Sequence, residues 1–337
     1  MATEASPFPG TRNRRLLLVV GVLAAAAAAV VVGATLLQSR GEHTTVPGAV
    51  TDARPGPPFL QLEFGIRSTP ETRALARAEV LFDKRHQAAR AAAIFRRYHS
   101  LEAQLGLAFA SWHGPSSLGA VQRLAAAHPN DPAALLNLGW ADYQAGRNAD
   151  ASAAWRRTAS RDADSAYGVD AEDALHGGPQ GLPPIVTGLA LPKAIAKLPA
   201  TAQLAALKRA AAGPNARAKL LYGTTLWNVL RMPVSAERQL AAAAKLAPHD
   251  AVVRTAAAVG LFSKATPTRA FAQLGPLTAV FPHSAVVEFH LGVLLVYIGE
   301  SAKAAKQLRA ALADGPHSPY AGFAKTLLAS LGSTRSK

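Results

Sequence analysis

The chain has 337 residues, a formal net charge of +15 and a composition that is half apolar but only 6% aromatic. It contains no cysteine, which excludes disulfide bonds, a thiol nucleophile and thiolate metal sites. Alanine is the dominant residue, and such a composition is typical of closely packed helices because alanine loses the least on entering a helix.

Residues 1–15 form a basic tail, and residues 16–38 are predicted to form a transmembrane helix. The run from residue 16 to residue 37 has 22 residues without a charge; at ~1.5 Å per residue it reaches about 33 Å and crosses a hydrocarbon core of about 30 Å. More arginines precede this run than follow it, which predicts a single-pass protein of the cell membrane with a cytoplasmic N-terminus and an extracytoplasmic repeat domain. The alternative is a signal peptide cleaved near Ala34, which would make the protein secreted.

One face of the predicted membrane helix carries small residues at four-residue intervals. Small residues let helices approach closely in lipid, so homodimerisation through this helix is an open alternative. The residues are Gly21, Ala25, Ala29 and Gly33.

Residues 39–69 form a proline-rich linker, and the prolines favour an extended chain. The end of the linker alternates between apolar and other residues, as a half-buried strand does. Two outcomes are open: the segment docks on the domain that follows, or it is a free linker. The prolines are Pro47, Pro55, Pro57 and Pro58, and the alternating residues are Leu60, Leu62, Phe64 and Ile66.

From residue 70 onward the apolar residues follow a helical period, and a pattern of four positions repeats every 34 residues. The first three positions form one helix stripe, and the proline at the fourth ends the unit because it denies a helix its amide donor. The pattern occurs at Ala236, Leu240, Ala243 and Pro248, then at Ala270, Leu274, Leu277 and Pro282, and then at Ala304, Leu308, Ala311 and Pro316.

A unit of 34 residues built from two antiparallel helices resembles the tetratricopeptide repeat family. The clearest copies are residues 132–165 and residues 285–318. The first carries Leu138-Gly139 in one helix, Gly146 at the turn, and Ala151 and Trp155 in the other; the second carries Leu291-Gly292, Gly299, Ala304 and Leu308 at the same places. Units at 98–131, 217–250 and 251–284 match the pattern less closely, and residues 70–97 keep only part of it.

The resemblance implies an all-α fold, in which the transmembrane helix is followed by a tetratricopeptide-type α-solenoid of helix hairpins. Its repeats occupy residues 70–165 and 217–318, and a capping helix at 319–333 closes the array. Residues 166–216 break the period and are expected to form an irregular insertion. Its glycine- and proline-rich first half reads as a loop and residues 201–213 read as a helix.

The family binds proteins or extended peptides in a concave groove, mostly through fixed positions on the first helix of each repeat. Carried onto this sequence, those positions are chiefly apolar and aromatic. Packing within the core is the alternative for the aromatic residues. The candidate ligand-binding residues are Leu136, Trp140, Tyr143, Gln144, Trp227, Asn228, Phe289, Val293 and Tyr297.

Two polar clusters invite a metal or catalytic interpretation. His283 and His290 flank Glu288, but His283 belongs to a series of histidines that each follow a repeat-ending proline, so we expect turn and surface histidines. The acidic cluster lacks the DxDxDG spacing of a calcium loop, and solvated loop charge is the preferred interpretation. That cluster consists of Asp162, Asp164, Asp170, Glu172 and Asp173.

The sequence contains no HExxH, GxSxG, P-loop or GxGxxG motif, so we predict a protein that is not an enzyme and needs no cofactor or metal. The predicted function is a membrane-anchored scaffold or adaptor for a protein or peptide partner, with an envelope-complex assembly factor as one specialised form. The alternative is a basic solenoid that binds anionic envelope polymer or lipid headgroups. Nucleic acid is disfavoured as a partner.

Overall fold

The computed structural model describes residues 52–333, and this part of the chain is all-α, without a strand. The predicted basic tail, the transmembrane helix with its small-residue face and the first part of the linker lie outside the described residues. No helix between residues 52 and 333 is long and apolar enough to cross a bilayer.

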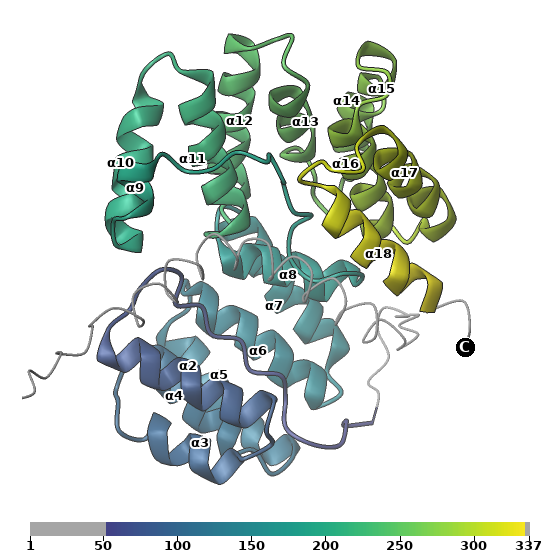
Figure 1. Ribbon diagram of the computed structural model, residues 1–337. Helices are drawn as coiled ribbons and strands as arrows, with labels where there is room; N and C mark the ends of the chain where they lie inside the picture. Colours follow the sequence, from purple (N-terminus) through teal and green to yellow (C-terminus); the bar gives the residue numbers. More distant parts are fainter. Residues whose placement is uncertain (1–51, 334–337) are drawn as a thin grey trace, which may run out of the picture.

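The described chain divides into an N-terminal half, residues 52–177, and a C-terminal half, residues 178–333 (Figure 1). Helices of the N-terminal half are α2 (Pro70–Asp83), α3 (Ala88–Phe95), α4 (Leu101–Ala110), η1 (Pro115–Ser117), α5 (Leu118–Ala127), α6 (Pro132–Gln144), α7 (Asn148–Arg161) and α8 (Ala166–His176). Helices of the C-terminal half are α9 (Lys193–Ala196), α10 (Ala200–Ala212), α11 (Ala216–Asn228), α12 (Pro233–Leu246), α13 (Ala251–Val259), α14 (Thr268–Leu274), α15 (Leu277–Val280), α16 (Ala285–Tyr297), α17 (Ser301–Asp314) and α18 (Ala321–Ser333).

Consecutive helices pack as hairpins, and small residues set how closely the two helices of a pair approach. A Cβ atom on Gly139 of α6 would lie 2.5 Å from Cδ1 of Trp155 on α7. A Cβ atom on Gly292 of α16 would lie 2.9 Å from Cγ of Leu308 on α17. The glycines predicted at these places are therefore needed for the hairpins to close. The solenoid of tetratricopeptide-like hairpins is confirmed for the described chain.

The residues after each repeat-ending proline begin the next helix. The carboxylate of Asp131 accepts hydrogen bonds from the backbone N–H groups of Ala133 (2.8 Å) and Ala134 (3.2 Å) at the start of α6. Asp250 caps α13 in the same way, at 2.8 and 3.1 Å. These caps satisfy N–H groups that the first helical turn leaves unpaired.

The expectation of an irregular loop from residue 166 onward is wrong for residues 166–176, which form α8. The Ser165 side chain caps this helix by accepting from the N–H of Gly168 at 3.1 Å, and α8 packs on α7 and α6 with Ala171 in the apolar cluster that holds Leu136 and Trp155. The glycine-rich stretch that suggested a loop only begins where α8 ends, at Gly177.

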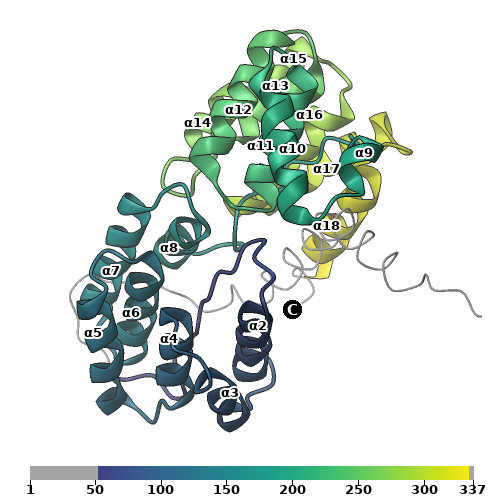
Figure 2. The same cartoon turned by 90° about the vertical axis from the view of Figure 1, so that its left-hand side faces the viewer.

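Two extended segments cross the solenoid without forming strands. Residues 52–64, called here the N-terminal strap, run between α2 and α6 (Figures 1 and 2). Residues 178–191, the central strap, connect α8 to α9 and lie inside the arc of the C-terminal helices. The two straps hold the features that bear on function.

Candidate functional site

The N-terminal strap is held in the groove of the N-terminal half through its backbone. Asn137 of α6 is fully buried, accepts a hydrogen bond from the N–H of Gln61 at 3.0 Å and donates one to the carbonyl of Gln61 at 2.8 Å. The indole of Trp140, one turn along the helix, donates to Oε1 of Gln61 at 3.1 Å. Asn137 thus pairs with the strap as a neighbouring strand would.

At the start of the strap, Gln144 performs a similar role. Its side-chain Nε2 lies within hydrogen-bond distance of the backbone carbonyls of Arg54 (3.1 Å), Pro55 (2.8 Å) and Gly56 (2.9 Å). The backbone carbonyl of Gln144 accepts a hydrogen bond from the N–H of Arg54 at 2.8 Å. The guanidinium of Arg54 lies over the ring of Tyr143, 3.5 Å from the ring centroid. A cation over an aromatic face adds electrostatic attraction to these hydrogen bonds.

The strap also contributes apolar anchors. Leu60 and Leu62 are 1% and 5% exposed, and the ring of Phe59 packs edge-on against Trp140 with the centroids 5.5 Å apart. The N–H of Leu62 donates to Oε1 of Glu79 on α2 at 2.9 Å. Burial raises the pKa of Glu79 to about 8, so this carboxyl is largely protonated at neutral pH.

The central strap is held in the same manner within the C-terminal half. Oδ1 of Asn228 accepts from the N–H of Ile185 at 3.0 Å, and its Nδ2 donates to the carbonyl of Ile185 at 2.8 Å. The indole of Trp227, which is fully buried, donates to the carbonyl of Pro183 at 2.7 Å. An asparagine and a tryptophan from one helix therefore hold each strap.

Two further side chains of α16 complete the binding of the central strap. Nε2 of His290 accepts from the N–H of Val186 at 3.0 Å, and the hydroxyl of Tyr297 donates to the carbonyl of Leu182 at 3.0 Å. His290 is 1% exposed, and burial lowers its pKa to about 4. This histidine is therefore a neutral structural acceptor, and the expectation of a surface histidine is wrong for this position.

The acidic cluster joins the two halves of the molecule. Asp164 accepts from the N–H of Ser235 at 2.9 Å, and Asp173 forms an ion pair with Lys264 at 2.6 Å. Between residues 52 and 333 no group of acidic or histidine side chains has the arrangement of a metal site. The preferred interpretation of solvated loop charge is therefore wrong for Asp164, Asp170 and Asp173, whose partners come from the other half of the chain. Glu172 instead pairs with His176 on its own helix.

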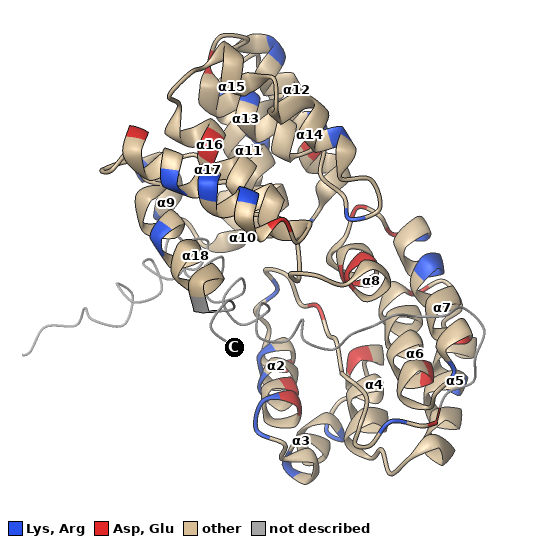
Figure 3. Cartoon of the chain, turned by 90° about the vertical axis from the view of Figure 1, so that its right-hand side faces the viewer, with Lys and Arg blue, Asp and Glu red and all other residues tan. Residues whose placement is uncertain are grey.

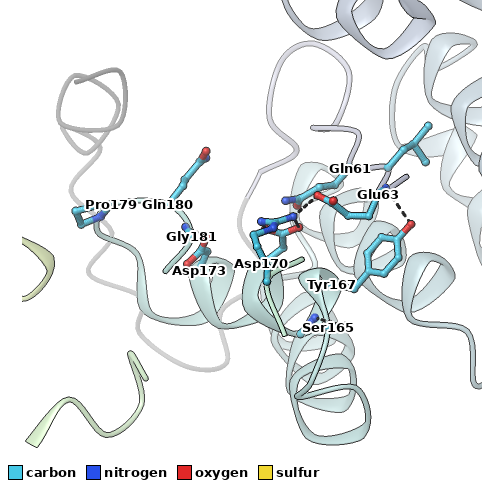
Figure 4. Close-up of polar contacts among 12 residues, drawn as sticks. Gln61, Glu63, Ser165, Tyr167, Asp170, Asp173, Pro179, Gln180 and Gly181 are labelled. Carbon is cyan, nitrogen blue, oxygen red and sulfur yellow. Dashed lines mark hydrogen bonds and ion pairs between the residues drawn. The ribbon is translucent and has the colours of Figure 1, made fainter. Parts of the chain in front are cut away.

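Arg231 lies where the N-terminal strap meets both halves. Its guanidinium binds both carboxylate oxygens of Asp170 on α8, at 2.5 and 3.0 Å, and forms an ion pair with Glu63 of the strap. The N–H of Glu63 also donates to the hydroxyl of Tyr167 at 3.1 Å (Figure 4). Burial raises the pKa of Asp170 to about 7, although Arg231 acts in the opposite direction.

The predicted ligand-binding residues fall into two groups. Those that contact one of the straps are Trp140, Tyr143, Gln144, Trp227, Asn228 and Tyr297. Leu136, Phe289 and Val293 are instead buried in the core at 0%, 1% and 2% exposure and offer no free surface to a ligand.

Four residues that hold the straps were not predicted from the sequence to do so: Asn137, Glu79, Tyr167 and His290. Asn137 could have been found, because it is the single polar residue within ALLNLGW and lies on the buried side of α6. The other three are ordinary surface-type residues in sequence, and nothing in their spacing points to a strap.

No protein-family model and no curated relative matches the sequence. Solved structures with a similar arrangement of helices include YrrB, a tetratricopeptide protein with an unusual peptide-binding site (18% identity, TM-score 0.32, 62% of this chain and 98% of that chain). Others are the TPR2AB domain of yeast Sti1 in complex with an HSP90 peptide (13%, 0.30, 78% and 98%) and a tetratricopeptide protein from Parabacteroides merdae (14%, 0.34, 78% and 98%).

Proposed function

We propose that this protein is a protein-interaction scaffold whose N-terminal groove binds an extended peptide in place of its own strap. The observation that carries the proposal is the bidentate pairing of Asn137 with the backbone of Gln61, supported by Gln144 at the start of the strap. Contacts to backbone groups do not depend on the bound side chains. A groove built this way can therefore accept other extended segments that supply two apolar anchors, as Leu60 and Leu62 do.

The N-terminal groove is better suited to exchange than the C-terminal one. Within the described chain the N-terminal strap is joined to a helix only through residues 65–69, whereas the central strap is joined to α8 at one end and to α9 at the other. The central strap therefore cannot leave its groove without moving α8 or α9, whereas the N-terminal strap is fixed to a helix of the solenoid only at α2 and continues at its other end into the linker.

The cellular setting belongs to the same proposal. Residues 16–38 anchor the solenoid to the cell membrane, with the N-terminus in the cytoplasm and the repeats outside it, where they assemble envelope complexes. The support is the uncharged run and the arginines before it. Protease treatment of intact cells tests this: the repeats should be digested from outside, and protection of the repeats would contradict the orientation.

Exchange in the groove is tested with a fluorescent synthetic peptide of residues 52–64 and the full-length chain. Leu60→Asp with Leu62→Asp weakens the strap, because both side chains are buried. We expect fluorescence anisotropy to show tighter peptide binding to this variant than to the wild type. Adding Asn137→Ala should then reduce the affinity by about tenfold, since two hydrogen bonds are lost.

Asn228→Ala in the same strap-weakened background is the matched control, because it removes the equivalent contacts from the other groove. It should leave peptide binding unchanged. If the strap-weakened variant keeps its helicity but does not bind the peptide, the strap is a permanent part of the fold and the exchange proposal is wrong.

A second candidate, binding of anionic polymer or lipid headgroups, is favoured by how the charge is distributed. Residues 178–333 contain 16 Lys and Arg against 5 Asp and Glu, whereas residues 52–177 contain 14 of each kind. The excess positive charge therefore lies on the C-terminal half, and most acidic residues lie in the N-terminal half, which includes α8 (Figure 3). Polymer binding should weaken steeply with salt, whereas binding of the peptide in the apolar groove should not.

A further inference from the structure

An apolar cleft of about 610 Å³ is lined mainly by the C-terminal half, including Ile185, Val186 and Asn228 of the central-strap contacts. The central strap forms one wall, α10 and α11 form another, and the beginning of α18 closes one side. Its volume is within the range of roughly 300–1,000 Å³ that is usual for small-molecule sites. The lining is mostly aliphatic and includes Leu189, Leu191, Leu204, Leu221, Leu230 and Phe323.

The polar side chains of the α10 and α11 wall are already bonded within the chain. Asn228 is paired with the central strap, and Nε2 of Gln203 lies 2.7 Å from the carbonyl of Leu198. Thr224 and Thr225 both donate to the carbonyl of Leu221, at 3.1 and 2.8 Å. A peptide laid against this wall would leave its amide groups unpaired, which is costly, whereas a hydrocarbon chain needs no such partners.

Nearly all of the segments that line the cleft carry basic residues and no acidic ones; the exception is Ile66, which lies three residues from Glu63. Residues 174–236 and 315–333, which include nearly all of the lining, contain no Asp or Glu. The walls present exposed basic side chains within four residues of a lining residue. These are Lys193 beside Ala196, Lys208 beside Leu204 and Arg217 beside Leu221, each three or four residues away along one helix.

We propose that this cleft binds one acyl chain of an anionic phospholipid, with the lysines and Arg217 at its rim facing the phosphate. The aliphatic walls remove the hydrocarbon from water, and the basic rim selects the charge of the headgroup. The site does not depend on peptide exchange in the N-terminal groove. It differs from surface attraction to headgroups because the acyl chain itself is buried.

The test uses phosphatidylglycerol with a photoreactive diazirine near the end of one acyl chain, added to the full-length chain in mild detergent. After irradiation, mass spectrometry of peptides locates the attached lipid. We expect attachment within residues 185–230 and near Phe323. Attachment confined to residues 16–38 would show lipid around the predicted membrane helix alone and would overturn the proposal.

Leu204→Trp fills the cleft, and Leu246→Trp is the matched control because Leu246 is 45% exposed on α12 and does not line the cleft. Attachment within residues 185–230 should fall by about tenfold in the first variant and persist in the second. Equal attachment in both variants would overturn the assignment of the cleft.

Lys193→Glu with Lys208→Glu changes exposed positions only and therefore serves if Leu204→Trp does not fold. This variant should lose attachment of phosphatidylglycerol by about tenfold, whereas Arg238→Glu with Lys245→Glu on α12 should not. A phosphatidylcholine probe that attaches as strongly as phosphatidylglycerol would refute selection for an anionic headgroup. Full competition by glycerol phosphate would show headgroup binding without a buried acyl chain and would also refute the proposal.

Discussion

Replacing Arg231 by methionine tests how the strap and the two halves are held together. Arg231 is the positively charged partner of Asp170, whose side chain is 2% exposed, and of Glu63, whose side chain is 26% exposed. Removing one member of a buried ion pair leaves the other charge uncompensated, which costs about 3–5 kcal/mol. We therefore expect Arg231→Met to lower the free energy of unfolding by about that amount at pH 8.

Asp170→Asn should cost less, about 1–3 kcal/mol, because Arg231 keeps Glu63 as a partner and is itself partly exposed. The double variant should cost less than the sum of the two single variants, since both buried charges are then gone. Urea unfolding followed by circular dichroism measures all three differences.

The cost of Arg231→Met also depends on pH. Burial already raises the pKa of Asp170 to about 7 in the presence of Arg231, and losing Arg231 raises it further. A carboxyl whose pKa is higher in the folded state than in the unfolded state loses stability as pH rises through that interval. The variant should therefore be closest to the wild type at pH 5 and furthest from it at pH 8. A cost that is the same at both pH values, or a greater cost for Asp170→Asn, would refute this reasoning.

Three further predictions concern stability. Gly139→Ala places a Cβ atom 2.5 Å from Cδ1 of Trp155 and should lower the free energy of unfolding by about 1–3 kcal/mol in urea. Burial lowers the pKa of His290 to about 4, so the wild type should lose stability as pH falls from 6.5 to 4. The variant His290→Gln can still accept a hydrogen bond from the N–H of Val186 but does not titrate, so its melting temperature should fall less over the same pH interval. Burial raises the pKa of Glu79 from 4.5 to about 8, so the wild type should lose stability as pH rises through that interval, and Glu79→Gln should melt close to the wild type at pH 4 and above it at pH 8; equal melting at pH 8 would contradict the buried, protonated carboxyl.

The repeating unit follows from residue spacing alone. The period of 34 residues, the glycines at the closest helix approach and the proline at the end of each unit all act within one hairpin. Contacts between residues 16 positions apart, as in Gly139 and Trp155 or Gly292 and Leu308, fall inside one unit and recur in the next. Such local and repeated signals are readable because each copy supports the others.

The start of the irregular insertion was predicted too early in the sequence, at residue 166 instead of residue 177. The glycines and prolines of residues 177–192 dominated the composition of the whole stretch and concealed α8 just before them. The helix forms because Ser165 caps it and its apolar residues pack on α7, which is a tertiary contact. Composition averaged over a stretch therefore misplaced one helix.

Both grooves are filled by the chain itself, and this depends on contacts between residues far apart in the sequence. Asn137 and Gln61 are 76 positions apart, and Asn228 and Ile185 are 43 apart. A strap that is held through its backbone has no sequence pattern from which its groove could be predicted, because almost every residue offers the same N–H and carbonyl groups. The acidic cluster is similar: its charge is visible in the sequence, but Arg231 and Lys264 become its partners only when the two halves pack together.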